Sequence, residues 1–191
     1  MTTVPRIAPA EAPYPADVGE QLQRMMPPGA EPIGLFRTFV RNMPMATAMH
    51  GWGSYELSRH LSLPMRLREI VIDRTCARCG CEYEWGVHVQ FFADRVGLTG
   101  HQTSSLVHGG SADACWTEPV ERLLIELVDQ LHDEADVDDR LWEGLRTHLT
   151  DAQLLDAVAL CGWYHAISFV ARAARVDHEP GAPRFDDVAS A

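Results

Sequence analysis

Four residues between positions 69 and 88 are of the types that carry out acid–base and thiol chemistry: Glu69, Cys81, Glu84 and His88. The last three are spaced i, i+3 and i+7, which on a helix places their side chains along one face. A thiol, a carboxylate and an imidazole in one row can provide a nucleophile and a general acid or base. We therefore predict a candidate active site in this segment.

The position of each residue assigns it an expected role. Cys81 is expected in the first turn of a helix, where unpaired backbone N–H groups and the helix dipole lower the pKa of a thiol if the site is partly open. Glu84 is expected to hold the tautomer of His88 and to raise its basicity. Glu69 belongs to the preceding helix, and it reaches the same place if the two helices form an antiparallel pair around Gly80.

The same residues also have structural interpretations. Cys81 could be a small buried hydrophobe, and Glu84 could be a solvated surface charge. His88 could be a histidine of the core, and Glu69 could pair with a neighbouring arginine of its own helix. Spacing alone leaves both interpretations open.

The elements that must position these residues are helices. Pro64 suits the first turn of one helix, Gly97 suits a C-cap, and Thr150 with Gln153 forms a capping box. Alternating strand patterns with turn dipeptides are absent, so we predict an all-α fold, a compact domain of about eight helices. The helical spacing covers approximately residues 17–26, 33–42, 45–61, 64–79, 81–96, 99–108, 117–131, 138–148 and 150–176.

Length and charge limit the organisation and the partners of the chain. Its 191 residues, 46% of them hydrophobic, suit one domain over residues 16–176, with an extended arm at 1–15 and a flexible tail at 177–191. A net charge of −11 argues against nucleic acid and anionic membranes as partners. We find no apolar run of about 20 residues and no secretory signal, so we expect a cytoplasmic protein without a membrane span.

The pattern Glu69-x11-Cys81-x2-Glu84-x3-His88 resembles the signature of the alkylhydroperoxidase-D-like (AhpD-like) and carboxymuconolactone decarboxylase proteins. In the hydroperoxidase branch a second cysteine stands at the position of Glu84. In the decarboxylase branch a Glu/His pair occupies the positions of Glu84 and His88 without a redox cysteine. This sequence combines features of both branches, and the resemblance extends over about residues 20–176.

The resemblance implies a function and an assembly. We expect a decarboxylase-like enzyme that acts by general acid–base catalysis on a small oxo-acid or lactone, with Glu84 and His88 moving the proton. Tyr83 stands where a histidine of the hydroperoxidase relay would be, and His165 lies in the C-terminal helix. Both are expected to bind the substrate. The family also implies a homotrimer or homohexamer with the site near a subunit contact.

Two other functions remain open. The first is a thiol-dependent (hydro)peroxidase that uses Cys81, resolved by an external thiol or, less suitably, by Cys76 or Cys79. The second is a non-catalytic oligomeric binding or scaffold protein. Arg74 or Arg78 could bind a substrate carboxylate in the enzyme.

A structural zinc site is the remaining alternative, because Cys76-x2-Cys79 has a ligand spacing and Cys81 and His88 are near. A second half-site is missing from the sequence, so we predict no metal. The sequence also contains no phosphate-binding glycine loop and no dinucleotide fingerprint, so we predict no cofactor.

Overall fold

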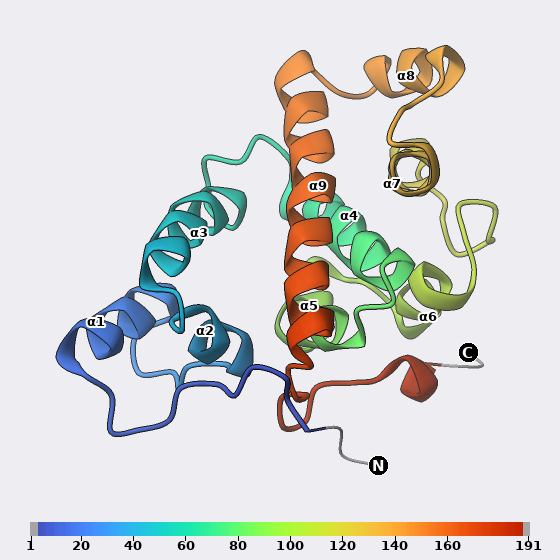
Figure 1. Ribbon diagram of the computed structural model, residues 1–191. Coiled ribbons are helices and arrows are strands. Elements are labelled where there is room, and N and C mark those ends of the chain that lie inside the picture. The colour runs from blue at the N-terminus through green and yellow to red at the C-terminus, as the bar shows by residue number, and fades with distance from the viewer. Residues whose placement is uncertain (1–3, 189–191) are drawn as a thin grey trace. The chain divides into compact units, whose positions relative to one another are not determined.

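The computed structural model describes residues 4–188. These residues form α-helices and one 3-10 helix, without a strand, and the all-α prediction is confirmed (Figure 1). Of the described residues, 4–61 and 170–180 form one compact unit, and 62–169 with 181–188 form a second unit. All four residues of the predicted active site belong to the second unit.

The first unit contains three helices, α1 (Ala16–Met25), α2 (Gly34–Phe39) and α3 (Met43–Glu56). The arm before α1 follows this unit closely, since the Ala10 amide donates to the Arg37 carbonyl at 2.8 Å. We predicted that the third helix would reach residue 61, but it ends at Glu56. The reason is local, because the Ser58 hydroxyl donates to the Tyr55 carbonyl at 2.9 Å and accepts the His60 amide at 3.0 Å, which competes with the helical pattern.

The second unit is built around α4 (Met65–Arg78), which packs against α5 (Glu82–Val96), α6 (Gly100–His108) and α7 (Pro119–Glu134). A short helix α8 (Asp139–Arg146) and the long helix α9 (Asp151–Ala174) follow, and the residues of α9 from 170 on belong to the first unit. One buried apolar cluster of this unit consists of Ile70, Ala93, Leu98, Leu106, Trp116 and Ile125. Helices α4, α5 and α9 provide the side chains of the candidate site.

Local signals define the ends of these helices. Gly80 has a φ of +61°, a left-handed conformation that lets the chain reverse between α4 and α5. Gly97, with a φ of +66°, is the predicted C-cap of α5. The predicted capping box before α9 is also present, because Gln153 Oε1 accepts the Thr150 amide at 2.9 Å and the Gln153 amide donates to Thr150 Oγ1 at 3.3 Å.

The segment that we expected to be a flexible tail contains a 3-10 helix, Phe185–Val188. The Phe185 amide donates to Glu82 Oε1 at 2.9 Å, and its ring contacts Trp85 edge-on with centroids 5.2 Å apart. Residues 181–188 therefore lie against the start of α5, whereas 189–191 lie outside the described residues.

Helix α9 qualifies the expectation that no apolar run is long enough for a membrane span. Its 24 residues include an 18-residue window with a mean hydropathy of 1.5, long and apolar enough to cross a membrane by length and composition alone. Polar residues such as His165 and Ser168 divide the sequence of α9 into short apolar runs. A search for one uninterrupted apolar run therefore does not find this helix, although its mean hydropathy is high. Half of that window is buried inside the protein, as in the core helix of a globular unit.

Candidate active site

The imidazole of His88 joins side chains from three helices. Its Nδ1 lies 2.8 Å from Oε2 of Glu69 on α4, and its Nε2 lies 2.9 Å from the hydroxyl oxygen of Tyr164 on α9. All three side chains are buried. We call Glu69, His88 and Tyr164 the relay, because each ring nitrogen has one partner through which a proton can move.

Glu69 is fixed from both sides. Its Oε1 accepts a hydrogen bond from Arg68 Nε at 2.7 Å, while its Oε2 faces the imidazole. The Arg68 guanidinium lies over the ring of Phe92, 5.1 Å from its centroid, and Phe92 also contacts His88. Glu69 therefore pairs with an arginine of its own helix and also reaches His88, as expected for helices that pair around Gly80.

Glu84 has part of the role that we predicted, because it raises the pKa of His88 without making the short hydrogen bond that holds the ring. Its Oε1 lies 3.6 Å from Nε2 of His88, one helical turn away, and the short hydrogen bond that orients the imidazole comes from Glu69 instead. Oε2 of Glu84 is buried and has no hydrogen-bond partner among residues 4–188. Glu84 thus presents an acceptor beside the relay, where buried polar atoms are normally satisfied.

The surroundings determine which atoms carry protons. Burial lowers the pKa of His88, but Glu69 and Glu84 outweigh it and raise the pKa to about 10. Burial raises the pKa of Tyr164 well above its usual value, and Glu84 and Glu69 add to the rise. At neutral pH His88 is therefore an imidazolium that donates Nδ1–H to Glu69 and Nε2–H to Tyr164. The phenolic O–H of Tyr164 remains available to donate to another group.

Asp73 is a buried member of the site that the sequence analysis missed. It lies one turn after Glu69 on α4, and the i, i+4 spacing of two acids on a core-facing helix was the available signal. Burial, with the nearby Glu69, raises the pKa of Asp73 well above its usual value. Ligand atoms of Asp73, Glu69 and His88 lie within 4.8 Å of one another, a grouping that could hold a cation. The raised pKa values of Asp73 and His88 disfavour such a cation, because a proton competes with it for the same atoms.

The thiol of Cys81 differs from the prediction. Cys81 is the N-cap of α5 and is buried, and burial raises its pKa to about 11 although the Glu84 amide and the Ser168 hydroxyl act in the opposite direction. The predicted lowering required a partly open site, and α9, which contributes Ser168, closes it. Cys76 is buried as well, and burial together with Cys81 and Glu84 raises its pKa.

The structure separates the remaining predicted residues from the relay or leaves their roles untested. Tyr83 is buried on α5, and its role in substrate binding stays a prediction. His165 points to His132, with Nε2 2.9 Å from Nδ1 of that ring, while its neighbour Tyr164 faces His88. One residue on a helix corresponds to a rotation of about 100°, so that adjacent residues face different neighbours.

The two arginines proposed for a substrate carboxylate have partners in the protein. Arg74 donates to both oxygens of Asp129, at 2.7 and 2.8 Å. Arg78 pairs with Asp133 at 2.5 Å. These interactions assign both arginines to contacts between α4 and α7.

Comparison with known proteins yields structural relatives. No family model and no curated protein matches the sequence. An uncharacterized peroxidase-related protein from Silicibacter sp. TM1040 is similar with a TM-score of 0.76 and 15% identity, over 97% of this chain and 100% of that chain. The alkylhydroperoxidase AhpD core of a peroxidase-related protein from Ralstonia eutropha JMP134 gives 0.77 and 15% identity, over 91% and 93%.

The debrominase Bmp8 is a third structure of this kind, with a TM-score of 0.77 and 14% identity, over 95% of this chain and 97% of that chain. A variant of Bmp8 with one cysteine replaced by alanine was solved in complex with 2,3,4-tribromopyrrole. These likenesses show that the chain has the AhpD-like helical fold. The resemblance inferred from the segment between Glu69 and His88 is thus confirmed at the level of the fold, a fold that enzymes such as this debrominase also have.

Proposed function

We propose that the chain is an enzyme that moves protons by general acid–base catalysis on a small molecule able to form an enolate, such as an oxo-acid or a lactone. The relay is the observation that carries this proposal, because one imidazole hydrogen-bonds a carboxylate and a phenol at 2.8 and 2.9 Å. Oε2 of Glu84 and Oδ1 of Asp73, both without a partner in the described part of the chain, support the presence of a small polar molecule or water beside it.

The relay provides an acid in the ionisation state that the reaction needs. Decarboxylation of an oxo-acid breaks the C–C bond to the carboxylate, releases CO2 and leaves the electron pair in an enolate. Tyr164 gives its O–H proton to the enolate carbon, and Nε2–H of His88 replaces that proton on the phenol oxygen. Glu69 holds Nδ1–H throughout and stabilises the imidazolium, and His88 then recovers a proton from solvent.

A substrate panel with relay variants tests this proposal. Small oxo-acids and lactones are incubated with the wild-type chain in deuterated solvent, and CO2 release and deuterium incorporation are followed by mass spectrometry and NMR. We expect Tyr164→Phe and His88→Gln to lower kcat by about 10²–10⁴-fold, as for loss of a general acid. Tyr55→Phe on α3 is the matched control and should retain the wild-type rate. Wild-type turnover by both Glu84→Gln and His88→Ala would overturn the proposal.

A thiol-dependent reaction at Cys81 is the second candidate. Its support is the position of Cys81 at the start of α5, next to the Glu84 amide and the Ser168 hydroxyl. In this candidate the thiol of Cys81 must first lose its proton, and the sulfur then attacks a peroxide, breaks the O–O bond and becomes a sulfenic acid that an external thiol reduces. Detection of that sulfenic acid by a trapping reagent tests the candidate, and Cys81→Ser is its control.

We also propose, from the resemblance, a cytoplasmic homotrimer or homohexamer. Exposed apolar side chains on α9 support association, because Leu155 and Phe169 are 71% and 65% exposed. Light scattering of the eluted peak in size-exclusion chromatography gives the mass. A Phe169→Glu variant should dissociate further than wild type, and a monomeric wild-type chain would contradict the assembly.

A further inference from the structure

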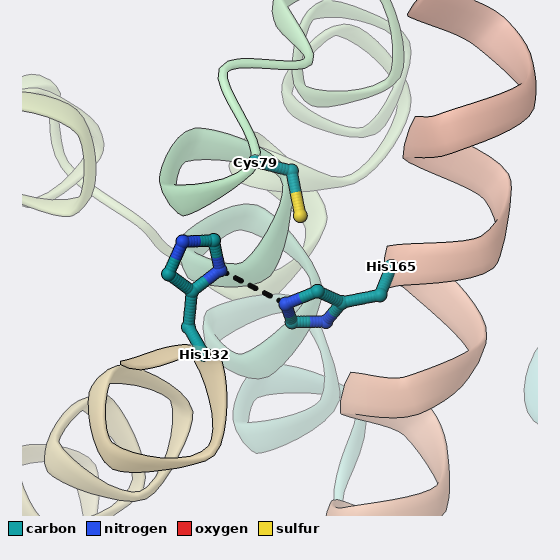
Figure 2. A group of neighbouring side chains, drawn as sticks. All are labelled: Cys79, His132 and His165. Atoms are coloured by element: carbon teal, nitrogen blue, oxygen red, sulfur yellow. Dashed lines mark hydrogen bonds between the residues drawn. The ribbon is translucent and has the colours of Figure 1, made fainter. Parts of the chain in front are cut away.

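A second group of chemically active side chains lies at the C-terminal end of α4. Cys79 is the C-cap of α4, His132 belongs to α7 and His165 to α9 (Figure 2). One sulfur or nitrogen atom from each residue lies within 4.8 Å of the other two. We call these three residues the Cys79 cluster, and none of them is part of the relay.

The two histidines approach each other with ring nitrogens, as Figure 2 shows, and the sulfur of Cys79 points toward them. Nδ1 of His132 lies 2.9 Å from Nε2 of His165. A tetrahedral zinc ion with Zn–N bonds of about 2.0 Å separates two imidazole nitrogens by about 3.3 Å. The rings therefore need to part by only a few tenths of an ångström for an ion to take the place of the shared proton.

The tautomer of His165 is set for ligation. Its Nδ1 lies 2.8 Å from the backbone carbonyl of Cys161, and a carbonyl only accepts, so Nδ1 carries the hydrogen. The lone pair is then on Nε2, the nitrogen that faces His132. Histidines that bind metals commonly donate their other N–H to a carbonyl or carboxylate, which fixes the ring as it is fixed here.

The charges around the Cys79 cluster allow a cation. Arg78 is the positive residue next to Cys79, and it pairs with Asp129 at 3.4 Å and Asp133 at 2.5 Å. Cys79 is buried, whereas His132 and His165 are partly accessible, so solvent reaches the Cys79 cluster at its two imidazoles.

We propose that Cys79, His132 and His165 bind a divalent cation, Zn²⁺, through one thiolate and two imidazoles. Mixed sulfur and nitrogen ligands favour zinc over magnesium or calcium, which prefer oxygen. On binding, the Cys79 thiol releases one proton to solvent. His132 donates Nδ1–H to His165 before the ion binds, so its hydrogen moves from Nδ1 to Nε2 and frees the Nδ1 lone pair for the ion. Three protein ligands leave a fourth position for water, as in catalytic rather than structural zinc sites.

Metal binding by the full chain tests this inference independently of the proposed function. The purified chain is treated with chelator, dialysed against Zn²⁺ and analysed by inductively coupled plasma mass spectrometry. We expect about one zinc per chain for wild type, and at least a 100-fold loss of affinity in Cys79→Ser and His165→Ala, since even the loss of a residue that only orients a metal ligand costs about 10–100-fold. Cys115→Ser and His101→Ala are matched controls elsewhere in the unit and should bind as wild type.

Two measurements on the wild-type chain test the inference even if Cys79→Ser or His165→Ala fails to fold. Zinc should protect Cys79 of the wild-type chain from iodoacetamide, with the label located by mass spectrometry. Cobalt(II) should give the charge-transfer absorption of a cobalt–thiolate bond. A His88→Gln variant that keeps its zinc excludes the grouping of Glu69, Asp73 and His88 as the site. Absence of stoichiometric zinc, zinc retained in Cys79→Ser, zinc lost in His88→Gln, or labelling of Cys79 unaffected by zinc would each overturn the inference.

Discussion

The carboxylate of Glu69 lies 2.8 Å from Nδ1 of His88, although the two residues are 19 positions apart and belong to different helices. Both side chains are buried, and the other oxygen of Glu69 is held by Arg68. A charge so placed determines both how firmly the imidazole is oriented and how strongly it holds its proton. The first two predictions follow from this pairing.

Replacement of Glu69 by glutamine keeps the shape of the side chain and removes its charge. We expect the free energy of unfolding to fall by about 3–5 kcal/mol, because the buried charges of Arg68 and His88 both lose an ion-pair partner. The pKa of His88 should fall from its wild-type value of about 10, because Glu69 is its main source of stabilisation. Urea denaturation gives the first quantity and NMR titration of the imidazole the second. Exposed Glu143→Gln is the control and should change stability by less than about 0.5 kcal/mol.

The raised pKa of His88 also predicts how stability depends on pH. The folded chain holds the imidazole proton up to about pH 10, whereas the unfolded chain releases it near 6.5. The native state therefore binds more protons in this window, and the free energy of unfolding should decrease as pH rises, by up to about 1.4 kcal/mol per pH unit. The contribution is complete below pH 6.5 and is lost by about pH 10.

Denaturation curves at pH 7.0, 8.0 and 9.0 measure that slope. His88→Gln lacks the titrating group, so its stability should be lower at pH 7 and nearly constant over the same range. The raised pKa of Cys81 adds a decrease of the same sign only above its usual value of 9.0. A wild-type chain whose stability is level between pH 7 and 9 would contradict the assigned protonation.

Cys81 should be unreactive while the protein is folded. With a pKa of about 11, only about one Cys81 side chain in a thousand is a thiolate at pH 8. We expect iodoacetamide to label half-exposed Cys115 and to leave Cys81 unmodified, as located by mass spectrometry. Both cysteines should label equally in urea, which serves as the control. Labelling of Cys81 at the rate of Cys115 in the folded protein would instead favour the thiol-dependent candidate.

Signals that neighbouring residues form on their own predicted the end of α5 and the start of α9 correctly. The C-cap at Gly97 and the capping box at Thr150 were confirmed because neighbouring residues alone form them. The approach of Glu69 to His88 was predictable from one assumption, the antiparallel pairing of two helices around Gly80. These signals are sufficient to place α4, α5 and the motif that they share.

The contact of Tyr164 with His88 and the direction of the pKa shift of Cys81 could not be predicted from local signals. Helix α9 also has apolar residues on its exposed side, such as Leu155 and Phe169, so its sequence does not show which face meets His88, and His165 was chosen for its residue type. The pKa of Cys81 depends on burial by α9, which contributes Ser168 and lies more than 80 positions away in the sequence. Both depend on tertiary packing and not on local pattern.

Residues 181–188, which follow α9, approach the backbone of α5 closely at Gly86. A pair of glycine variants tests this contact. A Cβ atom at Gly86 would lie 2.5 Å from the carbonyl oxygen of Pro183, so Gly86→Ala forces residues 181–188 away from α5. We expect a loss of about 1–3 kcal/mol of stability, as for an overpacked contact, and faster cleavage by trypsin at Arg184.

Gly162→Ala in α9 is the matched variant, because nothing lies within 4 Å of its added methyl. It should stabilise the chain by up to about 1 kcal/mol through helix propensity, without changing cleavage at Arg184. Equal stability and equal cleavage in the two variants would show that residues 181–188 do not hold this position in solution.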